Sequence, residues 1–428
     1  MADNQFRHLE IGLWRQFDSV SIDFHPRLTV ITGANGAGKS TLLSLLAQHF
    51  GWSRHYLGVP KATSDGTLSF ISGLVTDLLK RFVFRTQQPN SIGYIDYTDT
   101  TRCTLIVNDN NSVQYAIAFM GQQAVQGLLI DSHRPNSIYS QVGSVPLQPM
   151  TAAQSYNNYN NEMHARYQGG HTGQSPIYRM KESIISMAIF GEGNRTLGGS
   201  NKGLLDTFNG FNEVLRNLLP PSLGFERISV RSPEVVLVTR SGEFMLDASS
   251  GGIMTLIDVA WRIFMFSRDK SEFVVLMDEP ENHLHPSMQR TLMRRLINAF
   301  PKAQFIIATH SPFMVSSVRD SNVYVLRYRQ DATSANISSD VGLAANRKVF
   351  SEPLPLTNKA ASAGDVLREV LGVPATMPEW VEEDLDDVIN RYRNQKLTSE
   401  LLDSFRTELT RLGFDEYYPE ALANLARQ

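Results

Sequence analysis

The chain has 428 residues, 42% hydrophobic and 19% charged, a composition typical of a globular protein with room for two or three domains. A net charge of −3 gives no overall basic field for nucleic acid, and the single cysteine, Cys103, excludes a disulfide framework and a cysteine-based zinc site. With neither a signal-peptide pattern nor an apolar run of the ~18 residues a membrane helix needs, we expect a cytoplasmic protein without a membrane partner.

The first predicted elements are a β-ribbon, a strand, a glycine loop and a helix. Alternating residues at 8–12 and 20–24 predict the ribbon, and the apolar run at 28–32 predicts the strand. Leucines at helical spacing predict a helix over residues 40–50. The order strand, loop, helix is the context that a phosphate-binding loop requires.

Residues 33–40 read G-A-N-G-A-G-K-S and match the pattern G-x-x-x-x-G-K-[ST]. The glycines allow backbone N–H groups to surround phosphate oxygens, because no side chains block them. Lys39 is predicted to supply the cation for the β- and γ-phosphates of ATP, and Ser40 a ligand for Mg²⁺. From this segment, the predicted nucleotide-binding residues are Gly33, Asn35, Gly36, Gly38, Lys39, Ser40 and Thr41.

A long mixed segment, about residues 52–245, follows as an insertion. Helical periodicity appears at residues 178–190 and 204–219, and strand-like pieces lie between residues 227 and 238. Residues 141–175 are rich in Ser, Asn, Gln, Tyr and Gly, with few apolar anchors. We expect this stretch to be a mobile insertion, with an ordered polar loop as the alternative.

Two later apolar runs end in residues suited to phosphate chemistry. Residues 273–277, F-V-V-L-M, predict a buried parallel strand ending in Asp278 and Glu279. Asp278 is predicted to hold Mg²⁺ through water, and Glu279 to be the general base on the attacking water. The strand at 304–308 ends in T-H-S-P, from which His310 is predicted to reach the γ-phosphate and that water. We therefore predict Lys39, Glu279 and His310 as catalytic.

The segment 246–252, L-D-A-S-S-G-G, leads directly into a predicted helix. Serine and glycine amides at a helix N-terminus make an anion site, here assigned to Ser250 with Gly251. One nucleotide cannot easily use two such termini from distant segments of one subunit. We therefore expect a dimer with ATP between subunits, the alternative being ordinary N-capping by Ser249 or Ser250.

Beyond residue 330 the chain becomes polar and then predicts short amphipathic helices at 363–371, 381–393 and 399–412. No sustained heptads predict a coiled coil. We expect an ATPase domain over residues 1–330 and a helical C-terminal assembly or docking region over 331–428.

Four motifs in this order resemble the ATP-binding-cassette (ABC) ATPases, in their SMC-like and OLD-like branch: residues 33–40, 249–252, 273–279 and His310. The continuation E-N-H-L-H-P at 281–286 is similar to OLD-type ATPases, whereas transporter cassettes differ there. The resemblance implies an α/β fold: an ABC-ATPase head with a P-loop sheet core and an antiparallel β-subdomain, a helical insertion and a small helical C-terminal region.

The resemblance also implies roles for further residues. Asn35 would approach the γ-phosphate, and Arg15 would contact phosphate unless it is simply solvent-exposed. Arg134 is a weaker candidate of the same kind. The segment at 249–252 departs from the family's signature motif, L-S-G-G-Q, in both possible alignments. The glutamine of the family's Q-loop has only Gln87 and Gln88 as candidates.

The whole pattern resembles the ATPase subunits of bacterial antiphage defence systems of the Septu and PARIS types. It implies an ATPase that dimerises around ATP, with higher oligomers open, and that scaffolds or restrains a separately encoded nuclease or toxin. The alternative is a DNA repair or recombination ATPase resembling RecF, with nucleic acid as its partner.

Overall fold

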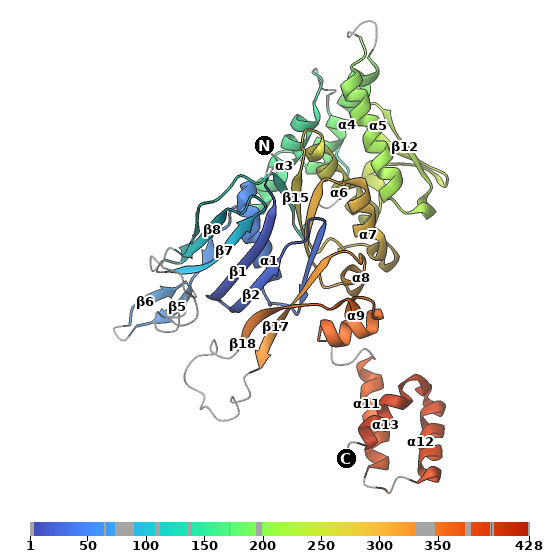
Figure 1. The fold of residues 1–428 in the computed structure, drawn as a ribbon. Helices are drawn as coiled ribbons and strands as arrows, with labels where there is room; N and C mark the ends of the chain where they lie inside the picture. The colour runs from blue at the N-terminus through green and yellow to red at the C-terminus, as the bar shows by residue number, and fades with distance from the viewer. Residues whose placement is uncertain are drawn as a thin grey trace. The chain divides into compact units, whose positions relative to one another are not determined.

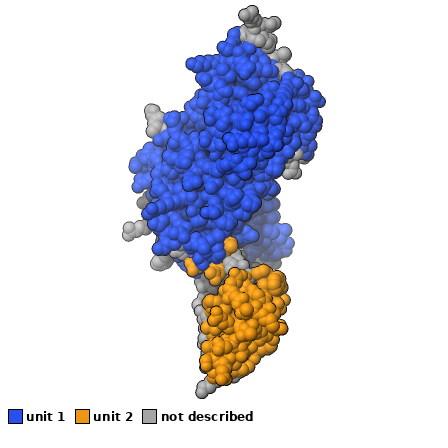
Figure 2. All heavy atoms as spheres, turned by 90° about the vertical axis from the view of Figure 1, so that its right-hand side faces the viewer, with its two compact units in different colours: residues 1–366 blue, residues 367–428 orange. Residues whose placement is uncertain are grey.

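The computed structural model describes residues 4–63, 66–72, 90–107, 112–134, 138–144, 146, 148–170, 172–193, 199–330, 347–372, 378–393, 395 and 398–426. The chain divides into two compact units, Met1–Val366 and Leu367–Gln428. Figure 1 shows the elements of each, and Figure 2 colours the units separately.

Within the described ranges, the largest sheet has eleven strands in the order β10-β8-β7-β1-β2-β18-β17-β3-β16-β15-β11. Its parallel core contains β3 (Leu28–Gly33), β16 (Ala303–Ala308), β15 (Phe273–Asp278), β11 (Gly127–Ile130) and β17 (Asn322–Gln330). Every residue of β3 and β16 is buried. Burial on both faces explains why these strands have unbroken apolar sequences.

The other half of the sheet is antiparallel and built from N-terminal segments. Its strands are β1 (Phe6–Trp14), β2 (Phe17–Asp23), β7 (Ser91–Tyr97), β8 (Arg102–Val107) and β10 (Ile117–Met120). Strand β18 (Arg347–Pro353) joins the halves, because it pairs with β17 on one side and with β2 on the other. The predicted α/β fold, a P-loop sheet core with an antiparallel β-subdomain, is confirmed.

Four long helices pack against one another at one end of the first unit (Figure 1). They are α3 (Ala152–Tyr167), α4 (Pro176–Glu192), α5 (Lys202–Leu218) and α6 (Gly251–Ser267). Helix α1 (Lys39–Ala47) contacts β15 and β16, and α7 (Pro286–Ala299) contacts α5 and the short α8 (Pro312–Val315). Of the helices in the described part of the chain, none has the length and apolarity needed to cross a membrane.

Shorter elements complete the first unit. The strands are β4 (Tyr56–Leu57), β5 (Val59–Ala62), β6 (Leu68–Ile71), β9 (Gln114–Tyr115), β12 (Phe225–Arg231), β13 (Glu234–Thr239) and β14 (Gly242–Met245). The single-turn helices are η1 (Gln48–Phe50), η2 (Pro221–Leu223), η3 (Leu246–Ala248), α9 (Leu356–Lys359) and α10 (Ala363–Asp365). The π-helix η5 (Val366–Val370) follows α10, and all but its first residue belong to the second unit.

Helix α3 corrects the expectation that residues 141–175 form a mobile insertion. A capping box begins the helix: the Thr151 hydroxyl accepts from the N–H of Gln154, whose side chain accepts from the N–H of Thr151. Tyr159 and Met163 are buried, and the Tyr159 hydroxyl donates to Asp258 of α6. Tyrosines supply much of the packing face, so the usual apolar residues are few.

The second unit is helical, with α11 (Glu379–Tyr392), α12 (Ser399–Leu412), η6 (Asp415–Tyr417) and α13 (Tyr418–Ala426). Its own core includes Val388, Phe405, Leu409 and Ala421. Strand β18, by contrast, falls inside the region 331–428 that we expected to be helical, yet it belongs to the main sheet of the first unit. Its sequence, R-K-V-F-S-E-P, contains only two apolar strand-forming residues, so the sequence gives little indication of a strand.

Candidate nucleotide site

The parallel strands bring the predicted motifs to one edge of the sheet. Asp278 pairs in register with Ala308, and Ala308 with Ile31, so β15, β16 and β3 end at nearly the same level. The glycine loop follows β3, Glu279 follows β15 and His310 follows β16. Ligands of open α/β sheets bind outside these carboxyl ends of the strands.

The loop folds around its own lysine. Gly38 has φ +101°, and a side chain there would meet the ring of Phe17 at 2.4 Å, so this position requires glycine. The Lys39 side chain is buried, and its Nζ donates to the carbonyl oxygens of Gly33 (3.0 Å) and Ala34 (3.1 Å). Burial lowers the pKa of Lys39 to about 8, although nearby carboxylates oppose the shift.

Asp278 and Ser40 form the predicted metal side of the site. The Ser40 side chain hydrogen-bonds Asp278, whose pKa is raised chiefly by burial. Asp278 Oδ1 is buried and has no hydrogen-bond partner among the described residues. A buried, unpartnered carboxylate oxygen beside a serine hydroxyl fits the oxygen-rich, partly hydrated coordination that Mg²⁺ prefers.

Glu279 and His310 face each other across the strand ends. His310 Nε2 lies 3.9 Å from Glu279 Oε1, and Asn282 Nδ2 donates to Glu279 Oε2 at 2.9 Å. Glu279 has φ +47°, a left-handed conformation that is uncommon outside glycine. Burial, together with the charge of Lys39, lowers the pKa of His310, so its imidazole is neutral near pH 7 and can accept a hydrogen bond.

Glu281 is a site residue that sequence reasoning missed. Its Oε1 accepts from the Thr309 hydroxyl (2.5 Å) and from the backbone N–H groups of His310 (3.0 Å) and Ser311 (3.2 Å). This carboxylate therefore fixes the turn that carries His310. The only signal in the sequence is its place in D-E-P-E, and nothing there indicates a partner in a distant segment.

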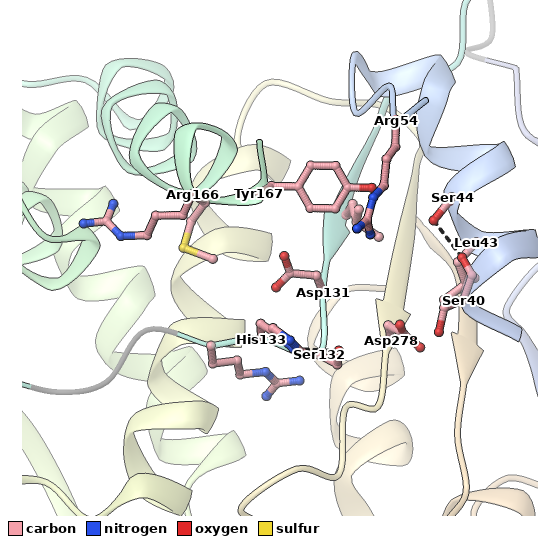
Figure 3. Close-up of a pocket in the computed structure, with 13 residues that line it drawn as sticks. Ser40, Leu43, Ser44, Arg54, Asp131, Ser132, His133, Arg166, Tyr167 and Asp278 are labelled. Atoms are coloured by element: carbon pink, nitrogen blue, oxygen red, sulfur yellow. Dashed lines mark hydrogen bonds between the residues drawn. The ribbon is translucent and has the colours of Figure 1, made fainter. Parts of the chain in front are cut away.

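A cavity of 440 Å³ opens beside Ser40 and Asp278, between α1, the end of β11 and α3 (Figure 3). Tyr167 and Arg54 approach each other over it, whereas Arg166 points away. Burial raises the pKa of Asp131, which lines the cavity. Within the described residues, Asp131 Oδ1 and the Tyr167 hydroxyl are buried without hydrogen-bond partners, so the cavity is suited to polar contents such as water.

Arg134, the weaker arginine candidate, lies next to the proposed base. Its Nη2 donates to the carbonyl oxygen of Glu279 at 3.4 Å, at the limit of a hydrogen bond. Arg15 is exposed in the β1–β2 turn, with its guanidinium 5.8 Å from the rings of Trp14 and Tyr56. Its contact with phosphate stays a prediction, and Gln87 and Gln88 lie outside the described residues.

The remaining predicted binding residues lie at the surface. Ser250 and Gly251 are exposed at the N-terminus of α6, and the Ser250 side chain makes no capping hydrogen bond. The Ser249 hydroxyl is buried and has no hydrogen-bond partner among the described residues either, so the N-capping alternative is not found. Asn35 is exposed in the loop, and Thr41 lies in the first turn of α1. Their contacts with a nucleotide stay predictions.

Comparison with known proteins gives the following relatives. Two "AAA domain" family models match, one over residues 8–113 and one, described as "AAA domain, putative AbiEii toxin, Type IV TA system", over residues 262–316. A "Septu protein PtuA" from Bacillus thuringiensis is 24% identical over 340 residues, which is 74% of each chain. Another, from Bacillus mycoides (strain KBAB4), is 27% identical over 192 residues, 44% of this chain but only 24% of that protein.

Two further matches come from a retron and from a solved structure. The "Retron Ec83 probable ATPase" of Escherichia coli is 30% identical over 135 residues, 29% of this chain and 24% of that protein. Among solved structures, an SMC head bound to the C-winged helix domain of ScpA covers 82% of this chain and 98% of its own, with a TM-score of 0.44 and 15% identity. The sequence matches confirm the predicted resemblance of this chain to Septu proteins.

Proposed function

We propose that this chain is the ATP-binding and ATP-hydrolysing subunit of a multi-component antiphage defence system. The arrangement of the phosphate loop, the Ser40–Asp278 pair and the facing Glu279 and His310 at one sheet edge is the observation that carries this proposal. The relatives named as Septu proteins and retron ATPases support the biological setting. The OLD-like affinity and the cytoplasmic location stay predictions.

The residues divide the work of hydrolysis. Lys39 leaves the carbonyls of Gly33 and Ala34 to bind the β- and γ-phosphates, where the loop N–H groups converge. Glu279 accepts the proton of the attacking water as general base, and the neutral imidazole of His310 holds that water and the γ-phosphate in line. When bound at Ser40 and Asp278, Mg²⁺ would neutralise charge on the phosphate oxygens.

ATP occupancy is proposed to join two copies of the chain. Ser250 and Gly251 are exposed, and Ser250 keeps its hydroxyl free of capping, which suits them to the phosphate held by another subunit. The dimer would then scaffold or restrain a separately encoded nuclease or toxin.

Glu279→Gln tests the catalytic assignment. The amide cannot take a proton from water, so hydrolysis should fall on the order of 100-fold while ATP binding persists. The ATP-bound dimer should therefore accumulate in sedimentation or light-scattering measurements. Asn282→Ala keeps the Glu279 carboxylate but removes the amide that donates to it, together with a longer bond of 3.5 Å to the Ser132 carbonyl oxygen, so its hydrolysis rate should fall between those of Glu279→Gln and the unaltered protein. Unchanged hydrolysis by Glu279→Gln would contradict the role of base.

A phage-plating assay tests the proposed role in antiphage defence. The gene, expressed with its native neighbours, should protect cells, and Lys39→Ala should abolish protection because the loop loses its cation. An effector should also copurify with the unaltered chain. Loss of protection must not come from unfolding, so the variant's thermal melting is the control. The absence of both protection and a copurifying effector would contradict the defence role.

A further inference from the structure

A lysine of the helical insertion is wholly buried and fully partnered. Lys181 of α4 has 0% exposure. Its Nζ donates to Asp247 Oδ2 (2.7 Å), to Glu234 Oε2 (3.0 Å) and to the carbonyl oxygen of Ser140 (2.8 Å). These three acceptors use all three donors of an ammonium group. The group therefore has no capacity left for a ligand, and its role lies in what it holds.

One of its partners stands directly before the predicted signature motif. Asp247 lies in η3, two residues ahead of Ser249, and its side chain is 2% exposed. The Ser249 N–H donates to the carbonyl of Leu246 at 3.1 Å, which closes that turn onto the start of α6. The position of Ser250 and Gly251 is thus tied to Asp247 through a single short turn.

The other partner ties the same lysine to the small sheet. Glu234 begins β13 and also accepts from the Tyr139 hydroxyl at 2.8 Å. Three separate segments, α4, β13 and η3, therefore meet on one ammonium group. Buried ion pairs add little net stability compared with apolar residues of the same volume, but their geometry is strict. Such a cluster fixes a position more effectively than it stabilises a fold.

We propose that Lys181, Glu234 and Asp247 form a positioning triad that holds the N-terminus of α6 in place for the nucleotide bound by a second subunit. This inference rests on the proposed function. The triad touches no phosphate; it acts through Asp247 and η3 on Ser250 and Gly251. Its loss should weaken ATP-dependent dimerisation and leave ATP binding by the loop of the same subunit intact.

The first test uses Asp247→Asn in a Glu279→Gln background, where the ATP-bound dimer should accumulate. ATP affinity, measured with a fluorescent analogue, should stay within about twofold, because the loop is untouched. The dimer dissociation constant should rise on the order of tenfold, since one lost charge-assisted hydrogen bond is of that size. Equal dimerisation with and without Asp247→Asn would overturn the triad.

Mixing experiments separate positioning from a general effect on folding. Lys39→Ala has a defective phosphate loop but an intact Ser250–Gly251 segment, whereas Asp247→Asn has an intact loop and a displaced segment. A dimer of the two variants therefore contains one site in which both halves are intact, and the mixture should regain hydrolysis. The reference mixture is Lys39→Ala with Gly251→Arg. Failure of the reference mixture would contradict the composite site of the proposed function. If the reference mixture regains hydrolysis and the mixture with Asp247→Asn does not, the triad is overturned.

Glu234→Gln keeps the test decisive if Asp247→Asn does not fold. The Glu234 side chain is 19% exposed, so this change is milder. It should raise the dimer dissociation constant two- to tenfold, with an unchanged melting temperature. In that case, the triad would be overturned if Glu234→Gln, added to Glu279→Gln, left the dimer dissociation constant unchanged.

Discussion

At the scale of single residues, Lys39 has two alternative sets of partners. In the structure its ammonium group donates to the carbonyl oxygens of Gly33 and Ala34, and burial lowers its pKa to about 8. A bound polyphosphate would surround it with negative charge and raise that pKa. Binding must therefore be coupled to protonation of Lys39 at alkaline pH.

This coupling predicts a pH-dependent affinity for ATP. Below about pH 8 Lys39 is already protonated and affinity should be flat; above it, affinity should fall by up to about tenfold per pH unit until the pKa of the bound state is reached. The last phosphate ionisation, near pH 6, is complete by then and does not contribute. Calorimetry in two buffers of different ionisation enthalpy should show proton uptake at pH 8.5. No uptake there would contradict the lowered pKa.

Glu281 gives a second prediction at this scale. Glu281→Ala leaves the Thr309 hydroxyl and the His310 N–H without their acceptor, whereas the Ser311 N–H keeps the Thr309 hydroxyl oxygen at 2.9 Å; the free energy of unfolding should fall by about 1–3 kcal/mol. Because those groups carry His310, kcat for ATP hydrolysis should fall on the order of tenfold, with less change in KM. Glu281→Gln retains an acceptor oxygen and is the matched control. Equal rates for the two variants would argue against this role.

Lys39, Asp278, Glu279 and His310 could be located from the sequence because each follows a recognisable apolar strand, and parallel strands end at one edge. Glu281, Lys181 and Asp247 could not. Their roles depend on partners 28 to 66 residues away, and the sequence around one side chain does not identify such a partner. Their chemistry emerges only with the tertiary structure.

At the scale of elements, helix α3 shows how a polar sequence becomes ordered. Its capping box satisfies the first N–H groups, and buried tyrosine supplies packing area with a hydroxyl that finds a partner on α6. Composition alone predicted mobility here because serine, asparagine, glutamine and glycine also dominate disordered segments. The long apolar strands and the helices at residues 178–190 and 204–219 had no such ambiguity.

Thr151→Ala tests the contribution of the cap. Loss of an N-cap costs about 1 kcal/mol, so the free energy of unfolding should fall by about that amount in a denaturant titration. Thr291→Ala is the control, since its hydroxyl bonds to Met288 within α7 and caps nothing. A full-sized loss for the control, or none for Thr151→Ala, would contradict this account.

At the scale of the whole molecule, the boundary of the large unit can be tested by truncation. A chain ending at residue 366 retains β18 and should bind ATP like the full chain, because the second unit has its own core. A chain ending at residue 330 lacks β18, so β17 keeps only its pairing with β3 and β2 only its pairing with β1, and each has one unpaired edge in the middle of the sheet. It should aggregate, since unpaired strand edges associate. Size-exclusion chromatography and nucleotide binding would distinguish the two.

The place of β18 also sets an order of events during synthesis. The N-terminal strands and the phosphate loop leave the ribosome first, at roughly 5–20 residues per second. Strand β18, which joins the antiparallel and parallel halves of the sheet, is the last of the sheet's strands to be translated. For most of its synthesis the nascent chain therefore carries two incomplete half-sheets with open edges. We expect this protein to depend on chaperones before residue 353 emerges, and to become nucleotide-competent only after it.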